Sequence, residues 1–173
     1  MTMDFDKNGE KLGAHEVAAR LRRHPTFLQQ FPDLSLTLAL MKQDTAAGTL
    51  RAMAASLTED FQGDLVRIVS FHPVDGLDDA DWLQVIGEDD SRLTGFRDIL
   101  GSGEPICGRL HPDKNALLYG ARAEEVQSSA LLVLPGVGLV AVGSRDGNRF
   151  FPGMGTLFLR MMGEALAAAL QRF

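Results

Sequence analysis

Two apolar runs joined by a Pro-Gly pair constrain the fold more than any other feature of the sequence. The first run covers residues 128–134, the second covers residues 137–144, and Pro135 and Gly136 lie between them. A short connection of this kind between two strand-like runs is typical of a β-hairpin. Strands joined by tight turns pair antiparallel, and helices cover the apolar faces of such a sheet. The hairpin therefore predicts an α/β protein of the α+β type, with an antiparallel sheet flanked by helices.

Helical periodicity is clearest between residues 45 and 61. Apolar side chains recur there at spacings of three and four residues, and Asp44 or Thr45 is placed to cap the first turn. Asp89 or Asp90 is placed to cap a second helix. The other expected elements are strands at 65–71, at 82–87 and around Ile106, helices over 91–100 and 152–173, and a loop or single helical turn over 111–120.

The N-terminal part of the chain predicts short helices rather than one long helix. Pro25 and Pro32 interrupt the helical apolar pattern in this region. The leucines of residues 34–40 fit both a strand and a helix, so periodicity leaves that segment open. We therefore divide the chain into an N-terminal helical segment at 1–34 and a main domain at 35–173.

Composition argues against several classes of function. The formal net charge of -6 and the isoelectric point near 5.1 disfavour direct nucleic-acid binding, which depends on a basic surface. The N-terminus has no apolar signal core, and the longest apolar run, 130–143, is too short and interrupted to span a bilayer. The single cysteine, Cys107, cannot form an intrachain disulfide and fits a reducing compartment. We expect a cytoplasmic protein that binds neither membranes nor nucleic acid directly.

Several motifs together resemble one protein family. They are VxxxLRRHPxFxxxFPDL at 17–34, TLALM at 37–41, CGRL at 107–110, SSALLVLPG at 128–136 and GSRDGNRFFPGMGTLFLRMMGEAL at 143–166. The sequence is similar to a proteobacterial family of GAF-like proteins, catalogued as domain of unknown function 484. The resemblance spans about residues 17–170 and implies the GAF fold, a small-molecule sensor fold with an antiparallel sheet.

The chain departs from that family pattern at one place. The family puts a long coiled-coil helix between its PDL and TLAL motifs, whereas here Asp33 and Leu34 run directly into Ser35, Leu36 and Thr37. That coiled coil would be the family's dimerisation element. GAF domains also commonly dimerise through their terminal helices, and the C-terminal helix of this chain is apolar on more than one face. The resemblance therefore implies a homodimer through the terminal helices.

The resemblance also implies a ligand site. In GAF folds the pocket lies between one face of the sheet and a segment that here corresponds to about residues 76–125. Seven residues are candidates to line it: Trp82, Phe96, Cys107, Leu118 and Tyr119 as apolar or amphipathic walls, and Arg109 and Ser128 as polar anchors. Apolar walls with a few polar anchors are usual for small-molecule sites. The implied function is that of a noncatalytic sensor or adaptor, not an enzyme, that binds a small molecule or a protein partner.

Cys107 supports an alternative interpretation, a thiol-dependent enzyme. One cysteine cannot complete the intrachain disulfide cycle of a GAF-type reductase, and Gly108 stands where a chromophore-binding cysteine commonly has a histidine. These features favour a buried structural thiol. A third interpretation is a degenerate GAF domain with a filled pocket that serves only in protein assembly.

The residues between the hairpin and the C-terminal helix predict a structural connection. Gly153 and Gly155 lack the third glycine of a dinucleotide-binding loop, because Phe158 stands in its place. The four histidines and the aspartates of 75–81 show no zinc or calcium spacing, so no metal or cofactor is expected. In the connection we expect Arg145, Asp146 and Arg149 to pair locally, and Phe150 or Phe151 to enter the core.

Overall fold

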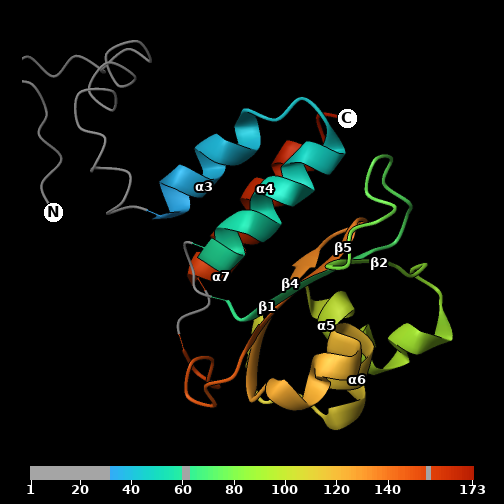
Figure 1. Cartoon of the computed structure of the whole chain (residues 1–173), viewed down its shortest axis with the longest axis vertical. Helices are drawn as coiled ribbons and strands as arrows, with labels where there is room; N and C mark the ends of the chain where they lie inside the picture. The colour runs from blue at the N-terminus through green and yellow to red at the C-terminus, as the bar shows by residue number, and fades with distance from the viewer. Residues whose placement is uncertain (1–31, 60–62, 155–156) are drawn as a thin grey trace, which may run out of the picture.

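The computed structural model describes residues 32–59, 63–154 and 157–173, and a five-stranded sheet lies at their centre (Figure 1). The strand order is β2-β1-β5-β4-β3, in which β1 and β2 run parallel and all other neighbours run antiparallel. The strands are β1 (Leu65–Ser70), β2 (Leu83–Val85), β3 (Ile106–Gly108), β4 (Ser128–Leu134) and β5 (Gly138–Ser144). The expected α+β architecture is confirmed, and it is consistent with a GAF-like fold.

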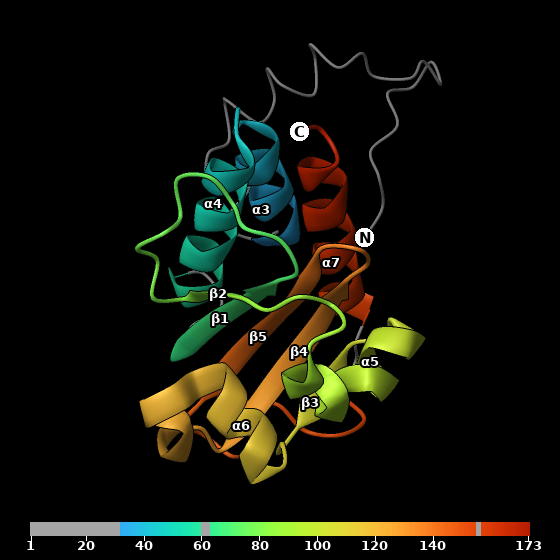
Figure 2. The same ribbon diagram turned by 90° about the vertical axis from the view of Figure 1, so that its right-hand side faces the viewer.

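Helices cover both faces of the sheet (Figure 2). Three longer helices cover one face: α3 (Pro32–Met41), α4 (Ala46–Glu59) and α7 (Leu157–Leu170). Short helices cover the other: η1 (Ser91–Phe96), α5 (Arg97–Ser102), α6 (Pro112–Tyr119) and η2 (Gly120–Glu125), of which η1 and η2 are 3₁₀-helices. Side chains alternate along a strand, so β4 supplies Ala130 and Leu132 to the long-helix core and Leu131 and Val133 to the short-helix core. No helix in the described ranges is long and apolar enough to cross a membrane.

The predicted hairpin is closed by a tight turn. The Val137 N–H donates to the Leu134 carbonyl at 2.9 Å. Gly136 has a φ of 72°, which is the left-handed value that the second central position of a type II turn requires. Pro135 suits the first central position because its ring fixes φ near the required value. Leu134 then pairs with Gly138, and this register continues along both strands.

Helix α4 forms as the helical pattern predicts. Leu50 and Met53 are buried in the long-helix core. Thr45 Oγ1 accepts a hydrogen bond from the Gly48 N–H at 3.0 Å, so it caps the first turn. The end of the expected helix, at 60–62, lies outside the described residues.

Helix α3 resolves the segment whose periodicity was ambiguous. It packs along α7, and Leu36 and Leu40 are buried in the long-helix core. It also runs without a break through residues 34 and 35, the point at which the family resemblance implies a coiled-coil helix. Residues 1–31 of the expected N-terminal segment lie outside the described residues, so the domain boundary stays a prediction.

Helix α7 buries most of its expected apolar stripe. The buried members are Leu159, Met162 and Leu166, and Leu170 is half-buried. Its other apolar side is partly covered from within the chain, because α3 and α4 both pack against it. Leu157 and Met161 remain exposed. A homodimer through the terminal helices stays a prediction.

The segment 111–120 is more helical than the sequence predicts. It was expected to form a loop or one turn, whereas α6 has eight residues. His111 Nδ1 accepts from the Asp113 N–H at 3.3 Å, and Pro112 occupies the first turn, where a missing N–H is harmless. Burial of Leu118 against the sheet stabilises the second turn, and this tertiary contact cannot be seen in the local sequence.

Candidate functional site

Buried side chains pack between the sheet and the short helices η1, α5 and α6. Phe96, Leu118 and Tyr119, three of the seven candidates, are only 1%, 0% and 2% exposed and pack in the short-helix core. The Tyr119 hydroxyl lies 2.9 Å from Ser129 Oγ, and burial raises the pKa of Tyr119 to about 12. These three residues therefore form packed core rather than the lining of an open cavity.

Three other candidates lie on the opposite side of the sheet. Cys107 is buried in the long-helix core, and Trp82 packs against the same core. Ser128 shares this side through the alternation of β4. Its Oγ donates to the Asp146 carbonyl at 2.5 Å and accepts at 3.2 Å from the N–H of Phe150, whose ring is buried as expected. The structure thus does not bring the seven candidates into one cavity, and their ligand-binding roles stay predictions.

Cys107 is expected to react slowly in the folded protein. It is buried, and desolvation raises the pKa of its thiol. The thiolate is the nucleophile, so a raised pKa keeps the thiol protonated at pH 7 and allows ionisation only at higher pH. Maleimide labelling at pH 7 should be at least about tenfold slower for the folded chain than in denaturant. Equal labelling rates in the two states would show an accessible, ionised thiol, and a Cys107→Ser chain provides the unlabelled blank.

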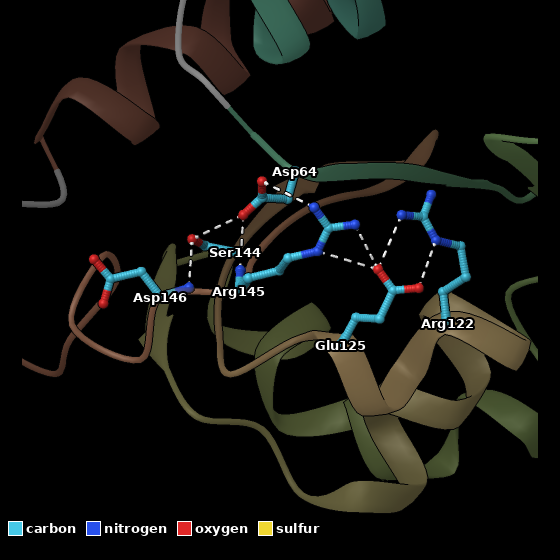
Figure 3. A network of polar contacts seen from close by, with 6 residues as sticks. All are labelled: Asp64, Arg122, Glu125, Ser144, Arg145 and Asp146. Carbon is cyan, nitrogen blue, oxygen red and sulfur yellow. Dashed lines mark hydrogen bonds and ion pairs between the residues drawn. The ribbon is translucent and has the colours of Figure 1, made fainter.

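Four charged side chains form a network at one end of the sheet (Figure 3). Glu125 accepts two hydrogen bonds of 3.0 Å from Arg122 and two from Arg145, at 2.7 Å from Nη2 and at 3.2 Å from Nε. Arg145 Nη1 also lies 4.0 Å from Asp64 Oδ1. Hydrogen bonds from Arg122 and then Arg145 lower the pKa of Glu125 to about 2, so its carboxylate is ionised at neutral pH. Exposed ion pairs contribute little to stability, so we expect the network mainly to hold the connection after β5 in place.

The network also fixes the connection that follows β5. Asp64 Oδ2 accepts from the Arg145 N–H at 2.7 Å and from Ser144 Oγ at 3.2 Å, and the Asp146 N–H donates to Ser144 Oγ at 3.1 Å (Figure 3). Arg145 thus pairs with residues distant in sequence, contrary to the expected local pairing with Asp146. Asp146 Oδ1 instead accepts from the Asn148 N–H at 2.8 Å and closes a turn.

A surface groove of about 620 Å³ lies between α6, η2 and the residues that lead into β4. We call it the α6–η2 groove. Its lining includes the apolar residues Leu110, Pro112 and Val126 and the polar residues Arg109, Asn115 and Gln127. Arg109 is the one sequence candidate among them, and its Nη2 lies 3.5 Å from Gln127 Oε1.

Asn115 is the unusual member of this lining. Its Oδ1 is buried and has no hydrogen-bond partner among the described residues. Buried polar atoms are nearly always paired, and an unpaired one costs about 1–3 kcal/mol. Nothing in the local sequence marks this asparagine. By contrast, the spacing of Arg122 and Glu125, three residues apart, is a recognisable signal for their pairing.

The central sheet, with helices on both of its faces, defines a mixed α+β domain that is consistent with a GAF-like fold and has grooves on its surface. Residues 49–173 match the family model described as "Protein of unknown function, DUF484". This match covers more than half of the chain, and the chain therefore belongs to the DUF484 family, as its motifs at 107–110, 128–136 and 143–166 predict. A comparison with curated proteins finds no match. Within the described part of the chain, no three His, Cys, Asp or Glu side chains gather as a metal site.

Proposed function

We propose that the chain is a noncatalytic sensor or adaptor module, acting in the cytoplasm, whose α6–η2 groove binds a small molecule or a segment of a partner protein. The observation that supports this most directly is the buried, unpaired Oδ1 of Asn115. Because this oxygen has almost no exposed surface, a ligand N–H or O–H group would satisfy it once the Asn115 side chain turns toward the groove, whereas a purely apolar ligand would leave it unpaired.

The other lining residues suit the same role. Leu110, Pro112 and Val126 offer apolar walls, and Arg109 offers guanidinium N–H donors. A few polar groups within apolar walls fix the orientation of a ligand. A ligand with a hydrogen-bond donor at one end and a carboxylate or carbonyl at the other would pair with Asn115 and Arg109 together.

The filled short-helix core favours a second candidate, a domain that serves only in protein assembly. Phe96, Leu118 and Tyr119 occupy the space where the GAF resemblance places a ligand. The thiol-dependent enzyme is disfavoured, because Cys107 is buried and its pKa is raised by desolvation. The two remaining candidates differ in whether the α6–η2 groove takes a small molecule.

A homodimer through α7 is part of both candidates. Leu157 and Met161 of this helix are 68% and 45% exposed, although the helix is apolar on this side. A second copy of the chain would bury them, and such burial is the usual driving force of association.

Asn115→Ala tests whether the α6–η2 groove binds a small molecule, which is the point on which the two candidates differ. It removes an unpaired acceptor and introduces the best helix former, so the free energy of unfolding of the ligand-free chain should rise by about 1 kcal/mol. Small carboxylates and amides, screened by thermal shift, should include compounds that stabilise the wild-type chain but neither Asn115→Ala nor Arg109→Ala. The matched control is Arg97→Ala, which removes an exposed arginine of α5 outside the groove and should retain every response.

Two outcomes would contradict the groove as the site. A loss of stability in Asn115→Ala would show that its side chain makes a stabilising contact. Compounds that stabilise both groove variants as much as the wild type would bind elsewhere on the chain. An empty screen would favour the assembly function.

A further inference from the structure

Among the described residues, no strand pairs with the first half of β1 on the side away from β5. Strand β2 pairs only with Ile68–Ser70, whereas β5 pairs along the whole of β1. A groove of about 410 Å³ lies at the unpaired part of this edge, and we call it the β1-edge groove. Its charged and aromatic lining consists of Arg51, Arg67, Arg122, Glu59, Asp64 and Trp82.

The strand backbone supplies one hydrogen-bond donor to this groove. The Ile68 N–H donates to the Trp82 carbonyl at 2.7 Å, so the backbone groups of Ile68 point toward the β2 side. Because this direction repeats every second residue, the backbone groups of Val66 point to the same side, beyond the end of β2. The Val66 carbonyl accepts from Arg67 Nη1 at 2.9 Å, and the Val66 N–H points to the same side, where Val66 lines the groove.

Three arginines, one each on α4, β1 and η2, line the groove. Arg51 Nη2 donates to the Gly76 carbonyl at 2.5 Å, and Arg67 Nη1 donates to the Val66 carbonyl. Neither of these two arginines forms an ion pair with a carboxylate of the described residues. Arg122 uses Nε and Nη2 for Glu125, which leaves its Nη1 outside that pair. Each guanidinium carries five N–H donors, so these bonds leave most donors available.

Carboxylates offset part of this positive charge. Glu59 and Asp64 line the groove, and Asp64 is already bound by the N–H of Arg145 at 2.7 Å and lies 4.0 Å from its guanidinium. The positive charge of Arg122 is the most strongly offset of the three, because Arg122 donates two hydrogen bonds to the Glu125 carboxylate. The other two arginines therefore carry the positive charge that a ligand would meet.

We propose that the β1-edge groove binds the phosphate group of a small anionic ligand. A carboxylate has two oxygens and is satisfied by one bidentate guanidinium, whereas a phosphate group has three strongly accepting oxygens and a charge near -2. Donors that arrive from three side chains and one backbone N–H match the phosphate group better. The volume of the groove leaves space beyond that group, and Trp82 offers an aromatic wall for the rest of the ligand.

Trp82 also makes the proposal measurable, because it is the single tryptophan of the chain. Inorganic phosphate and phenyl phosphate, added to the full chain, should change its fluorescence saturably. The affinity for benzoate, an aromatic carboxylate, should be lower than that for phenyl phosphate by a factor of at least about ten. Arg51→Gln and Arg67→Gln should each weaken phenyl phosphate binding about tenfold, since each removes a charge-assisted hydrogen bond.

Two controls make the result specific to this groove. Arg97→Gln removes the same charge from the exposed surface of α5 and should leave the affinity unchanged. Asn115→Ala alters the α6–η2 groove and should also leave it unchanged, so the two sites are tested separately. Thermal melting checks that each variant is folded, and Arg51→Lys, which keeps the charge but loses the planar fork, replaces Arg51→Gln if that variant unfolds.

Three results would overturn the proposal. The first is the lack of a saturable fluorescence change with phenyl phosphate. The second is an equal affinity for benzoate, which would remove the preference for phosphate. The third is an equal loss of affinity in Arg97→Gln and in the two groove variants, which would reflect net charge alone.

Discussion

Replacing Gly138 by alanine is expected to lower the free energy of unfolding by more than about 4 kcal/mol, a large part of the stability of a typical domain. A Cβ atom at this first residue of β5 would lie 1.8 Å from the Val69 carbonyl oxygen and 2.9 Å from the carbonyl carbon. Both atoms belong to the backbone of β1, so no side-chain rotation relieves the clash. Urea unfolding followed by circular dichroism measures the loss. A Gly138→Ala chain that accumulates only in insoluble form would agree with the expectation.

Gly136→Ala is the matched control, two residues earlier in the same hairpin. Gly136 also has a positive φ, 72°, but a Cβ atom there would meet nothing within 4 Å. Its replacement should cost only the penalty of a left-handed conformation, about 1–2 kcal/mol. Similar losses in the two variants would mean that backbone conformation, and not the contact with β1, explains the requirement at Gly138.

The hairpin and the helix caps could be predicted because they depend on residues that are neighbours in the sequence. Pro135 and Gly136 specify a turn by their own backbone preferences. Thr45 caps α4, and the Asp90 carboxylate accepts from the Arg92 N–H at 2.9 Å at the start of η1, as their positions before helical segments predict. In each case the physical cause lies within one turn of the chain.

The arrangement of the candidate residues could not be predicted in the same way. Cys107 pairs with Ala130 in the sheet and is buried in the long-helix core, whereas Tyr119 packs on the opposite face. The sequence places both between residues 76 and 125 but does not state which face of the sheet each one meets. Arg145 bonds to Glu125 and Asp64, which lie 20 and 81 residues away, so local spacing cannot reveal the network.

The core of the protein extends beyond the region that matches the family model. The match begins at residue 49, inside α4, whereas α3 precedes it and contributes Leu36 and Leu40 to the long-helix core. Helix α7 is the partner of α3 in this layer. A chain shortened to residues 49–173 would therefore lose the apolar side chains of α3 that pack against α7. We expect such a chain to be less stable, because the contacts of α7 contribute to the stability of the domain.

Leu166→Ala is expected to lower the free energy of unfolding by about 2–5 kcal/mol, the range for truncated core leucines. Leu166 is 0% exposed and belongs to the layer where α7 meets α3, α4 and β4. For a chain of this size the melting temperature should fall by about 2–4 °C for each kcal/mol lost.

Met161→Ala is the matched control for Leu166→Ala, because it shortens an apolar side chain of the same helix that is 45% exposed. Its effect should stay within about 0.5 kcal/mol in a monomer, as for most surface changes. A loss below about 0.5 kcal/mol for Leu166→Ala would place that residue outside the core. A large loss for Met161→Ala that grows with protein concentration would instead show that a second copy covers the exposed side of α7. The pair of variants thus tests both the packing within the chain and the proposed dimer, because the two contacts use different sides of one helix.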